Sequence, residues 1–153
     1  MEKTLVIVKP DGINRGIAGE IIHRFERKGL KIVAIKMLHL GDDLLDLHYE
    51  QHKDKPFFER LKSYMKKTPT ILMVLEGKGI VEVIRTIAGP TKGYEANPGT
   101  IRGDYSMSIQ NTVIHASESV EAAEKEIKIF FKDDEIFNYT RIDMEMIYAE
   151  EER

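Results

Sequence analysis

Short apolar runs that alternate with helical periodicity are the feature that most restricts how this chain can fold. Buried β-strands are expected at residues 4–8, 30–38, 70–75 and 107–116, where apolar and β-branched side chains cluster. Between these runs, apolar residues recur every three or four positions, as on the buried face of a helix. The predicted order, β-α-β-αα-β-α-β-α, fits a doubly wound parallel sheet or a split-βαβ antiparallel sheet, and periodicity does not distinguish them.

Cap residues and prolines predict where the helices begin and end. The first helix ends at Lys28-Gly29, because a cation and a glycine are typical of a helix C-terminus. Pro56 divides residues 42–65 into a helical hairpin. Ser119 is expected to cap a last helix whose apolar side chains lie on one face.

Three further segments lack a regular pattern. Residues 9–12 have the composition of a turn, and the chain from Lys132 onward is expected to be an irregular tail. Residues 89–103, which follow a helix ending near Gly89-Pro90, contain four glycines and two prolines. A loop of that length is more often functional than idle, so we expect it to reach a binding site.

The composition predicts one soluble globular domain, residues 1–153, with 42% hydrophobic and 32% charged residues. The net charge of −3 disfavours nucleic acid as the main partner, because nucleic-acid binders usually carry a basic excess. The absence of cysteine excludes thiol catalysis and fits a reducing compartment. No segment resembles a signal peptide or a membrane span, so we expect a cytoplasmic protein without a membrane partner.

His115 is the strongest candidate for chemistry, since it ends a β-branched run just before a helix. A histidine can be a neutral nucleophile or base near pH 7, although its position alone also fits a core or surface residue. Glu126 could reach its ring, but the spacing favours an exposed helical glutamate. His48 and His52 have metal-ligand spacing on a helix, but the pattern lacks the glutamate of H-E-x-x-H, which favours a structural or surface pair.

The chain contains neither G-x-x-x-x-G-K-[ST] nor G-x-G-x-x-G, so any phosphate must be bound by side chains. Candidates at the ends of elements are Lys9, Arg85, Thr91 and Arg102. Taken separately, each of these cations is more often a solvated surface charge, and only convergence of several on one cleft would overturn that interpretation. Phe57 could stack on a flat ligand or belong to the core, and Phe58 is expected in the core.

Several motifs, in order and in register from about residue 3 to residue 148, resemble those of the nucleoside diphosphate kinase family. They are Thr4-Leu-Val-Ile-Val-Lys-Pro-Asp11, His48-Tyr49 with Lys55-Pro-Phe-Phe58, Pro98-Gly-Thr-Ile-Arg-Gly-Asp104 and Val113-Ile-His-Ala-Ser-Glu-Ser119. The resemblance implies a ferredoxin-like βαββαβ fold of class α+β, with an antiparallel four-stranded sheet, an added helical hairpin and a C-terminal helix. It also implies reversible γ-phosphoryl transfer between nucleoside tri- and diphosphates by a ping-pong mechanism.

The resemblance assigns a role to each candidate. His115 would be the nucleophile, phosphorylated on Nδ1, with Glu126 orienting its ring, Ser117 in the same network and Tyr49 completing the catalytic group. The phosphates would be surrounded by Lys9, Tyr49, Arg85, Thr91 and Arg102. Phe57 would stack on the base, with Ile109 on its other face and Leu61 nearby. Apolar stacking would explain tolerance of different bases.

Two positions depart from the family pattern. Thr112 stands where the family usually has an asparagine that touches the sugar, and Gln51 stands where an acid is common near the metal. We therefore expect Mg²⁺ to be held mainly by the nucleotide phosphates, with no dedicated protein cage.

The alternatives to a kinase are a non-catalytic nucleotide-binding or regulatory module and an interaction protein. The family also implies a closed homo-oligomer, a homohexamer or a tetramer.

Overall fold

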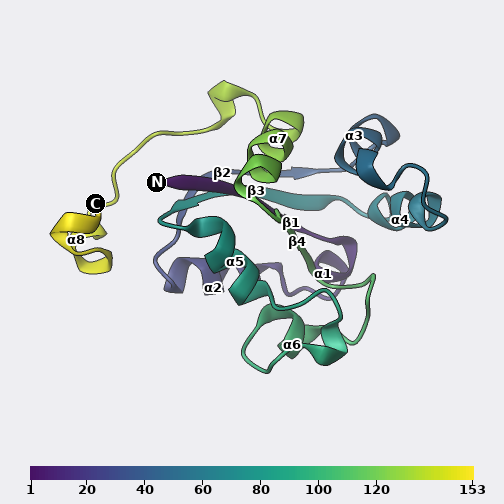
Figure 1. Ribbon diagram of the computed structural model, residues 1–153, viewed down its shortest axis with the longest axis horizontal. Coiled ribbons are helices and arrows are strands. Elements are labelled where there is room, and N and C mark those ends of the chain that lie inside the picture. Colours follow the sequence, from purple (N-terminus) through teal and green to yellow (C-terminus); the bar gives the residue numbers. More distant parts are fainter.

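The computed structural model describes residues 1–153 and is built around a four-stranded sheet of order β2-β3-β1-β4 (Figure 1). The strands are β1 (Glu2–Val8), β2 (Lys31–Leu38), β3 (Thr70–Gly77) and β4 (Ile114–Ala116). Every neighbouring pair is antiparallel. This order and direction confirm the ferredoxin-like α+β fold and exclude the doubly wound parallel sheet, which sequence periodicity alone had left open.

Central strand β1 is apolar along its length because helices cover both faces of the sheet. Its residues from Thr4 to Val8 are fully buried, and their side chains alternate between two separate core clusters. Leu5 and Ile7 pack into one cluster, and Val6 and Val8 pack into the other. Strand β1 therefore holds the two halves of the core together.

The helices lie on both faces of the sheet, with α3, α4 and α7 on one side and α2 and α5 on the other (Figure 1). Their bounds are α1 (Pro10–Asn14), α2 (Ala18–Arg27), α3 (Asp42–His48), α4 (Phe58–Met65), α5 (Ile80–Ala88), α6 (Ile101–Tyr105), α7 (Val120–Phe130) and α8 (Met144–Ile147). Four single-turn 3₁₀ helices are η1 (Glu50–His52), η2 (Gly93–Glu95), η3 (Asp133–Glu135) and η4 (Glu150–Glu152).

Both predicted helix caps are confirmed. The Ser119 hydroxyl accepts a hydrogen bond from the Ala122 amide at 3.1 Å, which caps the start of α7. Gly29 follows the end of α2 with a φ of 91°, a conformation that glycine adopts without steric cost. The predicted hairpin is also present, since α3 and α4 flank Pro56.

The fourth strand is shorter than predicted, because only residues 114–116 pair with β1. The preceding residues form hydrogen bonds with local serine side chains instead. The Ser108 hydroxyl accepts from the amides of Gln110 and Asn111, at 3.1 and 3.0 Å, and the Ser106 hydroxyl donates to the Asn111 carbonyl at 2.8 Å. Serine side chains that satisfy the backbone in this way compete with strand pairing.

Three segments predicted to be irregular contain helical turns. Residues 89–103 include η2 and the start of α6, which begins because the Thr100 hydroxyl caps the Gly103 amide at 2.9 Å. The predicted turn at 9–12 continues into α1, with Pro10 at its first position, where proline is tolerated.

The tail from Lys132 onward contains α8 and is anchored to the rest of the chain, so it is not irregular throughout (Figure 1). The Tyr148 hydroxyl accepts from the Lys78 amide at 3.3 Å. Ile147 packs so closely on Gly29 that an added Cβ at that glycine would lie 2.9 Å from Ile147 Cγ2. None of the helices has the length and apolar composition needed to cross a membrane.

Candidate active site

A cavity of about 470 Å³ opens where β1 and β4 meet the α3–α4 hairpin and the 89–112 segment. This volume lies within the range of small-molecule sites. With the exception of Ser117, the cavity is lined by every residue to which the sequence assigned a site role. Those residues are Lys9, Tyr49, Phe57, Leu61, Arg85, Thr91, Arg102, Ile109, Thr112, His115 and Glu126.

His115 and Glu126 form the hydrogen bond that the spacing had disfavoured. Nε2 of His115 lies 2.8 Å from Oε2 of Glu126, and the Ser117 hydroxyl donates to the same oxygen at 2.7 Å. An ionised carboxylate only accepts hydrogen bonds, so the proton of a neutral ring belongs on Nε2 and the lone pair on Nδ1. The expectation of an exposed glutamate is therefore wrong.

The state of the Glu126 carboxylate follows from opposing effects. Burial alone would raise its pKa, but hydrogen bonds from His115 and Ser117 and the charge on His115 outweigh burial and lower the pKa below its usual value. Ser117 is fully buried, and its oxygen also lies 3.3 Å from the Leu5 amide of β1. The carboxylate that orients His115 is thus ionised and anchored to the central strand.

A strained turn at Val113 precedes His115. Val113 is the single non-glycine residue with positive φ, at 70°, and the Ile114 amide donates to the Thr112 carbonyl across it at 2.7 Å. This is the geometry of a γ-turn, and for a β-branched residue such a backbone costs about 1–3 kcal/mol.

The residues after β1 hold this turn in place. The Asp11 carboxylate accepts from the Val113 amide at 3.0 Å, and the Lys9 amide donates to the Val113 carbonyl at 2.8 Å. Tyr64 from α4 donates its hydroxyl to the same carboxylate. The K-P-D turn therefore shapes the strand that presents His115, a role for Asp11 and Tyr64 that the sequence did not reveal.

Two cations of the cavity wall are withdrawn from solvent, Lys9 almost fully and Arg102 in part. The Lys9 ammonium donates to the Gln110 carbonyl at 2.6 Å and to the Thr112 hydroxyl at 3.1 Å. Burial lowers the pKa of Lys9 to about 8, an effect that Asp11 opposes and Arg102 reinforces. Burial also lowers the pKa of Arg102 to about 10, with a further contribution from Arg85.

Arg102 divides its donors between the backbone and the cavity. Its guanidinium donates to the carbonyls of Gly89 and Ile114 at 2.9 Å each, and to the Thr112 carbonyl at 3.3 Å. A guanidinium has five N–H groups, so two remain for a ligand. Arg85 and Thr91 are exposed and form no side-chain hydrogen bond within the chain. The four groups that the sequence treated as separate surface candidates therefore converge on one cavity.

Three apolar side chains also line the cavity, two from the α3–α4 hairpin and one from the 89–112 segment. Phe57 and Leu61 are half-buried, and Ile109 is 57% exposed. The Phe57 ring lies 5.4 Å from the His52 ring. Phe58, by contrast, packs against the core cluster, as predicted.

Comparison with known proteins identifies the family to which this arrangement belongs. The family model described as "Nucleoside diphosphate kinase" matches residues 2–136. The chain belongs to the nucleoside diphosphate kinase family. It is therefore an enzyme that transfers a phosphoryl group from a nucleoside triphosphate to a nucleoside diphosphate.

Individual nucleoside diphosphate kinases match the chain over nearly its full length. The kinase of Archaeoglobus fulgidus is 51% identical over 98% of this chain and 99% of the relative. That of Parabacteroides distasonis is 53% identical over 99% of both. The solved structure of the Halobacterium salinarum kinase in complex with CDP superposes with a TM-score of 0.94, at 42% identity, covering 97% of this chain and 99% of that one.

Membership of the nucleoside diphosphate kinase family does not favour a non-catalytic nucleotide-binding module or an interaction protein. It also identifies nucleotides as the ligands of the chain. The first alternative, a non-catalytic nucleotide-binding or regulatory module, depended on Thr112 and Gln51. Thr112 is almost fully buried and accepts a hydrogen bond from Lys9, whereas Gln51 is exposed at the rim of the cavity.

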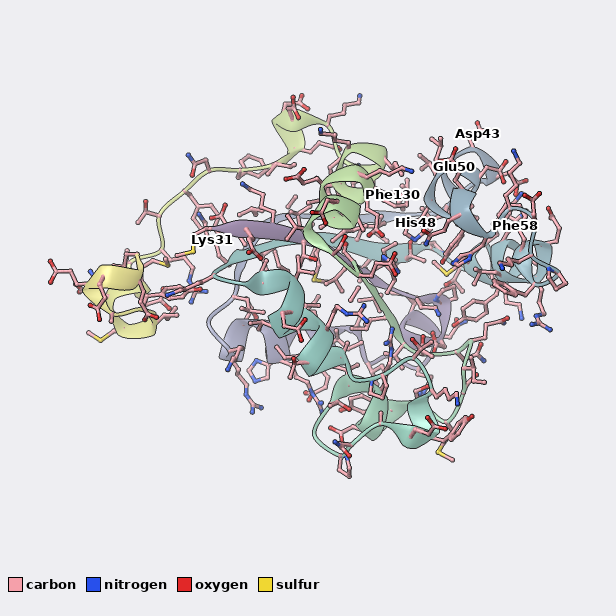
Figure 2. The ribbon with its side chains drawn as sticks, viewed as in Figure 1. Lys31, Asp43, His48, Glu50, Phe58 and Phe130 are labelled. Atoms are coloured by element: carbon pink, nitrogen blue, oxygen red, sulfur yellow. The ribbon has the colours of Figure 1, made fainter.

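Two residues beside the nucleophile candidate are buried. His48, labelled in Figure 2, was predicted to be structural or at the surface and is only 9% exposed. Its ring centroid lies 4.6 Å from that of His115. Burial lowers the pKa of His48 to about 3, with a smaller effect from His115, so the ring is neutral. The signal was available, because His48 follows buried Leu45 by three positions on α3. Neighbouring Tyr49 is also buried, which raises its pKa and keeps its phenol protonated.

Proposed function

We propose that phosphoryl transfer by this enzyme proceeds in two half-reactions through His115. The observation that carries the proposal is the 2.8 Å hydrogen bond from Nε2 of His115 to Glu126, which leaves Nδ1 with a lone pair beside the cationic end of the cavity. In the first half-reaction Nδ1 attacks the γ-phosphorus in line, an N–P bond forms, and the bond to the bridging oxygen breaks. The nucleoside diphosphate leaves with that oxygen's charge.

In the second half-reaction, a terminal oxygen of another nucleoside diphosphate attacks the phosphohistidine phosphorus. The N–P bond breaks, and the electron pair returns to Nδ1. One site used twice gives ping-pong kinetics. Glu126 keeps the ring in its productive tautomer throughout, because its carboxylate accepts the proton on Nε2 of His115. The Ser117 hydroxyl donates to the same carboxylate and holds it in place.

The surrounding groups position the phosphates and neutralise their charge. Lys9, Arg85 and Arg102 supply positive charge, and the hydroxyls of Tyr49 and Thr91 supply further donors. Thr112 would offer its hydroxyl to the sugar, in the place of the family's asparagine.

The base would lie against the apolar end of the cavity. Phe57 would stack on one face of the base and Ile109 on the other, with Leu61 beside them. Stacking needs no hydrogen bonds to the edges of the base, so tolerance of different bases follows.

Mg²⁺ would accompany the nucleotide, bound mainly by its phosphates, and would bridge them and reduce their charge when bound. The oxygen ligands that Mg²⁺ prefers are scarce in the cavity wall. Glu126 is bonded to His115 and Ser117, so Glu118 is the one carboxylate of the wall left free. The other side-chain oxygens belong to neutral residues: Tyr49, Gln51, Thr91, Gln110 and Thr112. This donor set fits a metal that arrives on the nucleotide and does not fit a protein cage.

The quaternary structure we propose is a closed homo-oligomer, a homohexamer with a tetramer as the alternative, in which residues 1–153 form one domain. Edge strand β2 exposes Ile35 and Met37, and the tail exposes Ile142 almost completely. Apolar side chains on an unpaired edge are typical of an interface. Sedimentation equilibrium would give the mass of the assembly, and a monomer would contradict the proposed oligomer.

We also propose a cytoplasmic location, which the absence of cysteine supports.

Labelling with γ-labelled ATP in the absence of acceptor tests the mechanism. We expect one acid-labile label per chain in the wild type, its transfer to an added diphosphate, and no label in His115→Ala. His23→Ala, on the exposed side of α2, is the matched control and should label normally. Undiminished labelling of His115→Ala would remove His115 from this role.

A further inference from the structure

His48 is a buried imidazole without a hydrogen-bond partner in the chain. Both of its ring nitrogens are inaccessible to solvent and unpaired. Its ring packs edge-on against that of Phe130, also labelled in Figure 2, with the centroids 5.2 Å apart. It packs in the same way against His115, with the centroids 4.6 Å apart. Buried polar atoms are normally paired, so two unpaired nitrogens on one ring require an explanation.

The unpaired ring faces the group that the proposed mechanism uses. One nitrogen from each imidazole and one carboxylate oxygen, from His48, His115 and Glu126, lie within 4.8 Å of one another. Two histidines and one glutamate form a ligand set that is typical of Zn²⁺ sites with an open position. A neutral imidazole is the form that binds metal, and His48 is neutral.

A second, smaller cavity borders part of this cluster. It has a volume of about 60 Å³ and is lined by residues of α3, η1 and α7. Both His48 and Glu126 line it, together with the carboxylates of Glu50 and Glu118. Its single cation, Lys125, is already paired with Glu50 at 3.2 Å. The cavity is therefore acidic and suits the entry of a cation.

We propose that His48, His115 and Glu126 form a binding site for Zn²⁺, and that bound Zn²⁺ switches off phosphoryl transfer. Ligand atoms on one tetrahedral Zn²⁺ lie about 3.4 Å apart at bond lengths near 2.1 Å. His115 and Glu126 are already within that separation, so the main adjustment is a shift of the His48 ring on the order of 1–2 Å. Mg²⁺ would not compete, because it requires oxygen ligands in an octahedral arrangement.

The loss of transfer follows from the electrons of one ring. Zn²⁺ would take the Nε2 lone pair of His115 in place of the proton now shared with Glu126. A neutral ring bound through Nε2 carries its proton on Nδ1, so no lone pair is left to attack phosphorus. This second part of the inference rests on the proposed role of His115, whereas metal binding rests on the three side chains alone.

Co²⁺ titration of the full-length protein tests the site directly, since Co²⁺ is a visible-light probe for Zn²⁺ ligand sets. We expect the wild type to develop the d–d bands of bound Co²⁺ at one equivalent per chain, and Zn²⁺ to displace them. Removing a ligand should weaken binding by more than the roughly 10–100-fold lost when only an outer-shell partner is removed.

Two variants at His48 and one matched control test whether Co²⁺ binding depends on this histidine. His48→Gln keeps a polar side chain, and His48→Phe keeps aromatic packing against Phe130, so at least one is expected to fold, as judged by circular dichroism. His52→Gln removes the histidine one turn away, which is outside the cluster, and should titrate like the wild type. Unchanged Co²⁺ binding in a folded His48 variant would overturn the site.

Labelling with γ-labelled ATP and excess Mg²⁺, with and without Zn²⁺, tests the consequence. Zn²⁺ should suppress labelling of the wild type at least tenfold, and each His48 variant should show a ratio near one relative to its own rate without Zn²⁺. Zn²⁺ binding without suppression would overturn the switch. Absence of any label in metal-free wild type would instead refute the proposed role of His115, and the Co²⁺ titration would still decide the metal site.

Discussion

At the inner end of the cavity, His115, Glu126 and Ser117 are joined to one another and to β1 by hydrogen bonds, and a strained turn at Val113 presents the histidine. At the outer end, Ile109 is largely exposed and forms no such network. An inner end that is held by many contacts keeps a reacting atom in place. An outer end that is free to adjust can accept different ligands. Changes at the inner end should therefore lower the rate, and changes at the outer end should lower nucleotide affinity.

The largest effect is expected from Glu126→Gln at the inner end. The amide no longer compels the proton onto Nε2, so we expect kcat to fall about 10²-fold, less than the roughly 10⁴-fold of a triad Asp→Asn because His115 transfers no proton here. Stopped-flow measurement of single turnover would give the rate, with Glu124→Gln on the exposed side of α7 as control. A change in KM alone would contradict the assignment of Glu126 to the inner end.

Phe57→Ala tests the outer end. Loss of a stacking surface should raise KM about tenfold, in line with roughly 1–3 kcal/mol per stacked base, and leave kcat nearly unchanged. Tyr94→Ala removes an exposed aromatic side chain that does not line the cavity, and it should leave steady-state kinetics as they are. A large loss of kcat in Phe57→Ala would show that the two ends are coupled.

The pH profile tests the lysine between the two ends. In the proposed mechanism Lys9 would bind phosphate only when protonated, and its pKa of about 8 means that roughly a tenth of it is protonated at pH 9. We expect kcat/KM, which reports on the free enzyme, to fall about tenfold from pH 7 to pH 9. Lys9→Arg, whose charge persists above pH 12, should flatten this limb relative to its own value at pH 7. The same fall in Lys9→Arg would assign the limb to another group.

The smallest effect is expected from Ser119→Ala, which removes the cap of the helix that carries Glu126. Urea denaturation should show a free energy of unfolding lower by about 1 kcal/mol, a typical cost for a lost N-cap. Exposed Ser63→Ala is the control. Turnover should be unaffected, because Ser117 and β1 hold the inner end independently of the cap. A parallel loss of kcat would show that the inner end depends on α7 being capped.

Elements whose local pattern and tertiary environment agree were predictable from the sequence. The run from Thr4 to Val8 is uniformly apolar because helices cover both faces of β1, and Gly29 and Ser119 end and begin helices as expected. The strand order could not be derived this way, because the same alternation of elements fits parallel and antiparallel sheets. The antiparallel arrangement was predicted only from the resemblance to the nucleoside diphosphate kinase family.

The features that were missed depend on contacts distant in sequence or on local competition. The length of β4 was overestimated because the serines at 106 and 108 bond to nearby backbone, which an apolar pattern does not reveal. The bond between Asp11 and the Val113 amide joins residues 102 positions apart, so no spacing rule could find it. Glu126 was misjudged for a related reason, because its polar neighbours in sequence hide which side of α7 it occupies.

Arg102 has a practical consequence for anyone redesigning the substrate range. Its planar guanidinium joins the end of α5 at Gly89 to the backbone on both sides of Val113. A lysine there would keep the charge but could not reach three carbonyls at once. Engineering for altered nucleotides should therefore vary Ile109 and its neighbours and leave position 102 untouched, since even a charge-conserving exchange would loosen the backbone that presents His115.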